Sequence, residues 1–89
     1  MSKIIFEEQA LEDLRKWAKE NPKILKRIVE LMDSLRQDPF RGIGKPEALK
    51  HKYRGLWSRR ITDEHRLIYK VDAEKNIIIY SLVNHYPLD

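Results

Sequence analysis

Residues 55–71 read GLWSRRITDEHRLIYKV, and this stretch decides the fold because a short polar turn separates two β-type segments. Trp, Ile, Thr, Tyr and Val, which favour extended backbone, recur on the two sides of Asp63-Glu64. We expect one strand over residues 55–62 and a second over residues 65–71, joined by a tight turn. The pattern therefore predicts two antiparallel neighbours in a sheet.

Further β structure is expected on both sides of this hairpin. Residues 76–86 form a third expected strand, and the apolar run over residues 77–80 is typical of a central strand. Upstream, two of the three glycines and Pro46 predict a loop over residues 40–47. A short edge strand is expected over residues 49–53.

The first half of the chain predicts a helix hairpin. After a short strand over residues 3–6, apolar residues recur at helical spacing over residues 7–19 and again from 22 to about 37. Asn21-Pro22 suits the cap and the first position of the second helix. We expect one α+β domain over residues 1–89, with an N-terminal strand and a two-helix hairpin packed on an antiparallel sheet.

Composition excludes several classes of protein. The chain has no cysteine, which rules out disulfides and zinc–thiolate sites. Its 89 residues leave no room for a large cofactor. His51, His65 and His85 fall on different expected elements, so no metal site is expected. No apolar run approaches the ~20 residues that span a bilayer, and the acidic start is unlike a signal peptide. We expect a cytoplasmic protein that makes no contact with a membrane.

Positive charge is concentrated in one stretch. Residues 1–40 carry 8 Lys/Arg and 8 Asp/Glu, whereas residues 41–60 carry 7 Lys/Arg against a single acid, Glu47. Such a patch attracts polyanions by electrostatic steering and counterion release. It favours a nucleic-acid partner, with an acidic protein as the alternative.

The expected turns decide which side chains share a face of the sheet. With a two-residue turn after residue 62, Arg59 shares a face with Arg66. With a four-residue turn after residue 71, Arg66 lies opposite Ser81. His85 then falls on this same face and Arg60 on the other, because side chains alternate along a strand.

Three of these side chains match the needs of RNA cleavage by internal transesterification. The reaction needs a base for the 2′-OH, a cation for the phosphorane oxygens and an acid for the departing 5′ oxygen. Glu47 is the candidate base, Arg66 the phosphate clamp and His85, with an ordinary pKa near ~6.5, the acid. Simpler roles remain open: a surface ion pair for Glu47, a cross-strand ion pair for Arg66 and an exposed terminal position for His85.

Four segments resemble one family of bacterial toxins. They are GKPEALK over 44–50, GLWSRRIT over 55–62, EHRLIY over 64–69, and the late pair His85-Tyr86. Together they closely resemble the YoeB (Txe) family of the RelE superfamily, and the likeness extends over residues 5–86. Members commonly stop at the His-Tyr pair, whereas this chain continues with Pro87-Leu88-Asp89.

The resemblance implies a RelE-like microbial RNase fold and the toxin of a type II toxin–antitoxin system. It implies an endoribonuclease that binds the ribosome at the A site, in contact with 16S rRNA, and cleaves mRNA there without a metal or another cofactor. The implied partner is a YefM-type antitoxin, which joins the toxin on operator DNA in autorepression; a homodimer is a further possibility.

The resemblance also assigns roles to residues. Glu47 becomes the general base, Arg66 supports the transition state, His85 is the general acid and Tyr86 assists it. Lys50 and Arg60 match RNA-binding positions, and we add Arg59, which the predicted register places beside Arg66.

Two other functions remain open from the sequence. A RelE-fold toxin of the ParE kind poisons DNA gyrase and needs no acid–base pair. A non-enzymatic module would use the basic stretch over residues 41–60 to bind RNA or the ribosome without cutting.

Overall fold

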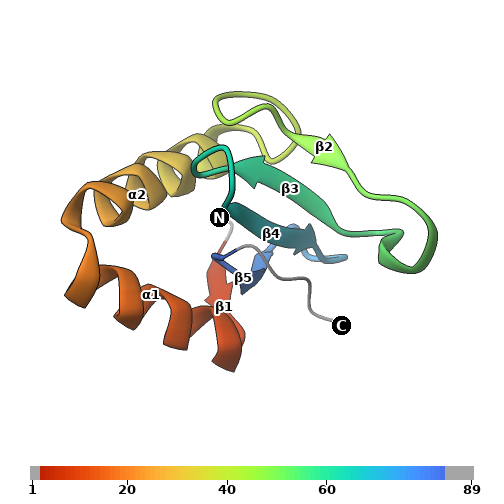
Figure 1. Cartoon of the computed structure of the whole chain (residues 1–89). Helices are drawn as coiled ribbons and strands as arrows, with labels where there is room; N and C mark the ends of the chain where they lie inside the picture. The colour runs from red at the N-terminus through yellow and green to blue at the C-terminus, as the bar shows by residue number, and fades with distance from the viewer. Residues whose placement is uncertain (1–2, 84–89) are drawn as a thin grey trace.

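Two helices cover one face of a five-stranded sheet in the computed structural model, which describes residues 3–83 (Figure 1). The strands lie in the order β1-β5-β4-β3-β2 across the sheet. Along the chain the elements are β1 (Ile4–Phe6), α1 (Glu8–Glu20), α2 (Pro22–Gln37), β2 (Glu47–Ala48), a 3₁₀ turn (His51–Tyr53), β3 (Trp57–Arg60), β4 (Arg66–Val71) and β5 (Ile77–Ser81). The predicted α+β fold with a helix hairpin on one sheet face is confirmed.

The sheet is mixed, because its first strand runs parallel to its neighbour. β1 pairs with β5 in parallel, with Ile4 opposite Ile77 and Phe6 opposite Ile79, whereas the other three pairings are antiparallel. The helix hairpin carries the chain away from β1, and the chain reaches β5 only after the antiparallel strands are built. The expected antiparallel sheet therefore holds for β2 to β5.

The first helix ends and the second begins at the predicted residue, Asn21. The Asn21 side chain accepts a hydrogen bond from the Ile24 N–H at 3.4 Å, and the Asn21 N–H donates to the Trp17 carbonyl at 2.9 Å. Pro22 follows as the first residue of α2, where a missing N–H costs no hydrogen bond. One residue thus closes α1 and caps α2.

A hydrophobic core fills the space between the helices and the sheet. Leu31 of α2, Leu67 of β4 and Ile79 of β5 are fully buried in it. Each such aliphatic side chain contributes about 1.5–3 kcal/mol when it leaves water. This core fixes the helix-facing side of the sheet, which is called here the inner face; the side away from the helices is the outer face.

The predicted edge strand is misplaced by a few residues. The structure puts the edge strand at Glu47–Ala48, while the segment expected to be extended contains the 3₁₀ turn His51–Tyr53. His51 has a φ of 58°, which an extended strand cannot contain. The chain therefore turns back toward β3 where a strand was expected.

The predicted register between β3 and β4 is wrong by one residue. Arg60 lies opposite Arg66, and Arg59 lies opposite Leu67. Five residues separate Arg60 from Arg66, and the Thr62 hydroxyl accepts the N–H groups of Glu64 and His65 inside this wider turn. Because one residue of slip moves side chains to the other face, Arg59 joins the core and Arg60 joins Arg66.

The pairing of β4 with β5 also differs from the prediction. Ser81 lies opposite Ile68, not opposite Arg66, because the turn after Val71 is one residue wider than expected and a bulge between Ile68 and Tyr69 shifts the register by one more. Ile68 is two residues from Arg66, so Ser81 still shares the outer face with Arg66.

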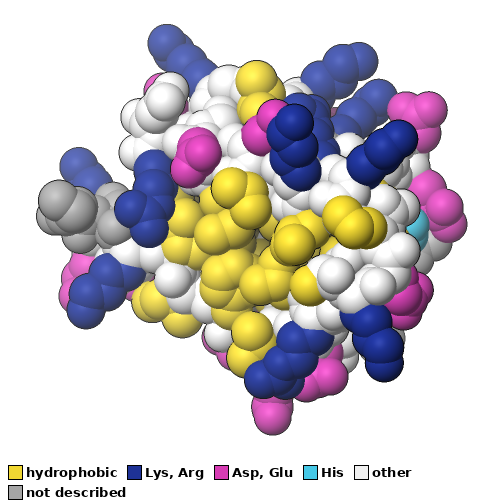
Figure 2. All heavy atoms as spheres, turned by 90° about the vertical axis from the view of Figure 1, so that its left-hand side faces the viewer, with side chains coloured by type: hydrophobic (Ala, Val, Ile, Leu, Met, Phe, Trp, Pro, Cys, Tyr) yellow, Lys and Arg dark blue, Asp and Glu magenta, His cyan; other side chains and the backbone are white. Residues whose placement is uncertain are grey.

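One side of the molecule carries an apolar patch. Figure 2 views the side on which α1 and α2 lie, and hydrophobic side chains gather there within a border of charged ones. Leu11 of α1 is 37% exposed and Val29 of α2 is 47% exposed. A patch of this kind on a small protein is typical of a protein–protein interface. In the described part of the chain, no helix is long and apolar enough to cross a membrane.

Tyr69 carries a polar group into the core. Its side chain is fully buried, and its hydroxyl donates a hydrogen bond to the Pro39 carbonyl. Burial raises the pKa of Tyr69 above its ordinary value of 10.0, and the hydrogen bond from Arg59 offsets part of this rise. The neutral hydroxyl is therefore the form that the fold requires.

Tyr69 should make stability sensitive to alkaline pH. The unfolded chain releases this proton near its ordinary pKa of 10.0, while the folded protein retains it to higher pH. The folded state then binds more protons, so the free energy of unfolding falls as the pH rises above this value. We expect Tyr69→Phe to flatten this decline in urea unfolding curves measured from about pH 8 to about pH 11.

Tyr80→Phe is the matched control, since Tyr80 is a half-buried tyrosine on the neighbouring strand. Equal alkaline declines in the wild type and in Tyr69→Phe would contradict this assignment.

Candidate active site

Glu47 begins the edge strand β2 and points to the outer face. It lies directly opposite Ser58, and the row continues across the sheet through Ile68 to Ser81. Residues directly opposite one another share a face, and Arg59, the neighbour of Ser58, is buried on the inner face. The Glu47 side chain is exposed. The candidate base therefore stands on the sheet face that the helices leave uncovered.

Arg60 and Arg66 lie on the same outer face. They are directly opposite one another on β3 and β4, and Arg60 is two residues along β3 from Ser58. Strand spacing places the Cα atoms of Glu47 and Arg66 roughly 12 Å apart. Glutamate and arginine side chains of ordinary length reach a common ligand across such a distance. The structure thus brings three of the predicted site residues to one surface.

The guanidinium of Arg66 is anchored on one side only. Its Nη1 donates to the carbonyls of Thr62 at 2.8 Å, Asp63 at 2.9 Å and His65 at 3.2 Å. Its Nε and Nη2 have no acceptor among residues 3–83. The β3–β4 turn therefore holds the planar fork and leaves two donor atoms for a ligand.

The Arg60–Arg66 pair is electrostatically unfavourable without an anion. Like charges directly opposite one another destabilise a sheet. Within residues 3–83 neither arginine forms an ion pair with a carboxylate. An anion bound between the two side chains offsets this repulsion, and a phosphate suits two guanidinium groups.

A basic hollow adjoins the edge strand. It has a volume of about 350 Å³ and is lined by Leu49, Lys50, His51 and Arg54. Lys50 is a predicted RNA-binding residue, and its side chain is exposed. His51 and Arg54 were missed because this segment was expected to be a strand, which would have turned alternate residues to opposite faces. The signal that identifies them is the positive charge of residues 41–60.

The structure contradicts the prediction that Arg59 binds RNA. The side chain is 0% exposed and faces the core between α2 and the sheet. The misjudged register is the reason, since it exchanged the faces of Arg59 and Arg60. Arg60, which was expected on the wrong face, is the exposed member of the pair.

His85 and Tyr86 lie outside the described residues, so their roles stay predictions. The described chain does show how β5 ends. The Leu82 N–H donates to the Asp13 carboxylate at 2.9 Å, and the Leu82 carbonyl accepts from the Trp17 indole at 2.8 Å. Two buried side chains of α1 therefore fix the backbone three residues before His85 in sequence.

Metal-binding residues do not gather in the described part of the chain, where no three His, Cys, Asp or Glu side chains lie together. The groups available on the outer face are a carboxylate and two guanidinium groups. This set can bind and polarise a phosphodiester and accept a proton.

Comparison with known proteins identifies the family. The model of the YoeB-like toxin of bacterial type II toxin–antitoxin systems matches residues 6–86. This chain belongs to that family. Toxin YoeB of Escherichia coli strain K12 is 44% identical over 84 residues, which cover 94% of this chain and 99% of the relative.

Solved structures of YoeB proteins share the fold. In the YoeB–YefM complex from Staphylococcus aureus, the similar chain is 44% identical, with a TM-score of 0.86 over 97% of this chain and 99% of its own length. The YoeB dimer from the same organism is 43% identical, with a TM-score of 0.86 over 96% of this chain and 98% of its own.

The neighbouring arginines of this YoeB-family chain should differ sharply in their effect on stability. Arg59→Met removes the donor of five hydrogen bonds whose acceptors are mostly partly buried, and we expect it to lower the free energy of unfolding by about 3–5 kcal/mol. Arg60→Met changes an exposed side chain and should alter it by less than about 0.5 kcal/mol. Urea unfolding followed by tryptophan fluorescence measures both, and losses of equal size would contradict the assigned faces.

Proposed function

We propose that this chain is an endoribonuclease that cleaves mRNA in the ribosomal A site and so inhibits translation. One observation carries the proposal: in a YoeB-family chain, the Glu47 carboxylate shares an outer sheet face with the Arg60–Arg66 pair, which forms no ion pair with a carboxylate of residues 3–83. A proton acceptor beside a phosphate-binding site is the minimum that cleavage of a ribonucleotide backbone requires.

The proposed reaction is an internal transesterification. Glu47 takes the proton of the 2′-OH, and the 2′ oxygen forms a bond to phosphorus. Arg66, with Arg60, stabilises the negative charge on the phosphorane oxygens. The bond to the 5′ oxygen then breaks, and His85 protonates the leaving oxygen with assistance from Tyr86. The products are a 2′,3′-cyclic phosphate and a free 5′-OH, and side chains supply each group without a metal ion.

A basic surface next to the proposed cleavage site can bind the parts of the RNA that flank the scissile phosphate. Lys50 and Arg54 line the hollow next to the strand that begins with Glu47. We propose that this hollow receives a phosphate of the mRNA or of 16S rRNA. The single-stranded backbone would then run from the hollow toward the Arg60–Arg66 pair.

The proposed protein partner is a YefM-type antitoxin. The YoeB protein of Staphylococcus aureus has been solved in complex with YefM and also as a dimer. The same pairing in this chain would cover its basic surface with an acidic antitoxin, and the complex would bind operator DNA in autorepression. A homodimer is compatible with the apolar patch over α1 and α2. The protein would act in the cytoplasm, where ribosomes are found.

Removing the proposed acid or base should abolish cleavage without abolishing binding. We expect Glu47→Gln and His85→Gln each to lower the single-turnover cleavage rate on mRNA-programmed ribosomes by about 10²–10⁴-fold, because each removes one proton transfer. Their affinity for ribosomes should stay within about threefold of the wild type, because positive charge supplies most of that binding. Glu20→Gln, at the exposed end of α1, is the control and should cut normally.

Wild-type rates in both variants would contradict the mechanism. A wild-type protein that leaves ribosome-bound mRNA intact but stalls DNA gyrase would instead support the ParE-like function. Tight ribosome binding with no cleavage would support the non-enzymatic module.

The basic hollow should contribute to affinity and not to chemistry. In a Glu47→Gln background, which prevents cleavage, Arg54→Gln should reduce the salt dependence of binding to single-stranded RNA by about 0.7 in log–log slope, the value for one phosphate contact. With Glu47 intact, Arg54→Gln should keep the saturating cleavage rate. Lys23→Gln, at an exposed position of α2, is the control. An unchanged slope for Arg54→Gln would show that the hollow does not bind RNA.

A further inference from the structure

The buried side chain of Arg59 uses its complete set of donors. A guanidinium has five N–H groups, and five hydrogen bonds leave this one, to two hydroxyls and three backbone carbonyls. The acceptors are Tyr69 Oη (3.4 Å), Ser34 Oγ (2.7 Å), Ile43 O (3.2 Å), Asp38 O (2.6 Å) and Arg41 O (2.9 Å).

Stability alone does not account for an arginine at this position. Taking a charge out of water is costly, and the five acceptors here are all neutral groups. An apolar set that replaced the arginine together with its acceptors could be as stable, whereas removing Arg59 alone leaves those acceptors unpaired. What only a planar, five-donor group provides is simultaneous contact with several acceptors in fixed directions.

Those acceptors belong mostly to one segment, residues 38–44, which we name the clamped segment. It contains no helix or strand. Five of its carbonyls bind groups of β3 and β4, since the Pro39 carbonyl accepts from the Tyr69 hydroxyl and the Gly44 carbonyl accepts from the Arg60 N–H at 2.6 Å. Side chains and one backbone N–H of the sheet therefore hold the backbone of this segment in place, as inter-strand hydrogen bonds hold a β-strand.

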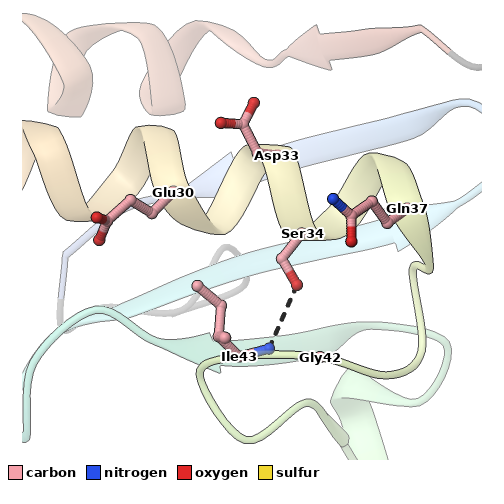
Figure 3. A pocket seen from close by; sticks show the side chains of 6 residues that line it. All are labelled: Glu30, Asp33, Ser34, Gln37, Gly42 and Ile43. Atoms are coloured by element: carbon pink, nitrogen blue, oxygen red, sulfur yellow. Dashed lines mark hydrogen bonds between the residues drawn. The ribbon is translucent and has the colours of Figure 1, made fainter.

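Packing fixes the clamped segment only in part, although the centre of the Phe40 ring lies 4.9 Å from that of the Trp57 ring. Phe40 is 47% exposed and Ile43 is 44% exposed. Figure 3 shows α2 above the backbone of Gly42 and Ile43, with a hollow of about 430 Å³ between them. Ser34 crosses this gap, because its hydroxyl accepts from the Ile43 N–H at 3.3 Å and from Arg59. The hydrogen bonds that meet at Arg59 thus fix the segment.

The clamped segment leads directly to the candidate base. After Gly44 the chain passes through Lys45, whose φ of 51° is costly for a residue with a side chain, and enters β2 two residues later. β2 contains only Glu47 and Ala48, and one further backbone bond, from the Leu49 N–H to the Leu56 carbonyl at 2.9 Å, continues its pairing with the chain that leads into β3. The position of the Glu47 carboxylate therefore depends on where the clamped segment delivers the chain.

We propose that Arg59 is the positioning residue of Glu47: its buried guanidinium fixes the clamped segment and thereby holds the carboxylate at its distance from Arg66. This rests on the proposed function, in which Glu47 is the base. Arg59 touches no substrate. It acts through the backbone of residues 38–44, on the face of the sheet opposite to the chemistry.

Native-state amide exchange tests the clamp without any activity. The reporter is the Arg60 N–H, bonded to Gly44, and the reference is the Ile77 N–H, bonded to Lys3 on the far side of the sheet. In Tyr69→Phe, which removes one link of the clamp, we expect exchange of the reporter to rise about tenfold or more while the reference changes less than about twofold. Arg59→Lys, which loses the planar fork, should show the same pattern.

Cleavage kinetics test the consequence for Glu47. A displacement of about 1 Å costs on the order of 100-fold in rate, so Arg59→Lys and Tyr69→Phe should lower the saturating single-turnover rate about 10–100-fold with the half-saturating ribosome concentration unchanged. In a Glu47→Gln background, Arg59→Lys should cause no further loss. Arg36→Lys, at an exposed position of α2, is the matched control.

Three results would overturn the proposal. The first is a parallel rise in exchange of the reporter and the reference, which indicates a loss of global stability only. The second is a wild-type cleavage rate in Tyr69→Phe and Arg59→Lys, and the third is a cleavage rate in the Glu47→Gln/Arg59→Lys double variant that is reduced by the product of the two single effects. If the wild type cleaves no RNA, the proposed function fails, whereas the exchange experiment still decides whether Arg59 fixes the path of the chain into β2.

Discussion

The backbone pairing of Arg60 with Arg66 decides which side of the sheet each residue of β3 and β4 faces. The turn between them has an odd number of residues, so Arg59 points into the core and Arg60 points outward. If the turn were shorter by one residue, a fully exposed Arg59 would leave the clamped segment without its donors, and Arg60 would be buried. Both the interior network and the proposed anion site on the outer face therefore depend on one register.

Two adjacent arginines have opposite environments in this fold, because Arg59 is buried and Arg60 is exposed. Inside, Arg59 finds neutral oxygens for all five of its N–H groups, so its charge is solvated by the protein in place of water. Outside, Arg60 faces the like charge of Arg66, and neither forms an ion pair with a carboxylate of residues 3–83. The interior arginine is complete without a ligand. The outer pair is not, and this is why the outer pair, and not Arg59, is the proposed anion site.

The sequence predicted those features that local signals specify. The helix hairpin follows from apolar spacing and from Asn21-Pro22, and the strands of the β3–β4 hairpin follow from β-branched and aromatic residues. The register could not be predicted, because the width of the turn depends on Thr62 capturing two backbone N–H groups. Burial of Arg59 could not be predicted either, since its carbonyl acceptors lie 16, 18 and 21 residues away and any residue type supplies a carbonyl. Glu47 was assigned from its charge and family likeness, and its strand was not foreseen.

The proposed base, Glu47, lies on a two-residue edge strand, which gives it access to a ligand but little support from backbone pairing. An edge position leaves Glu47 open to a long polymer that approaches along the outer face, and a strand this short offers little backbone for unwanted pairing with other chains. The same shortness removes most of the ladder that would otherwise fix its geometry. Proton transfer tolerates little misplacement of the base, so the geometry has to be fixed elsewhere. In this chain the fixed point lies on the other face of the sheet, where a desolvated guanidinium holds the backbone that leads to the carboxylate.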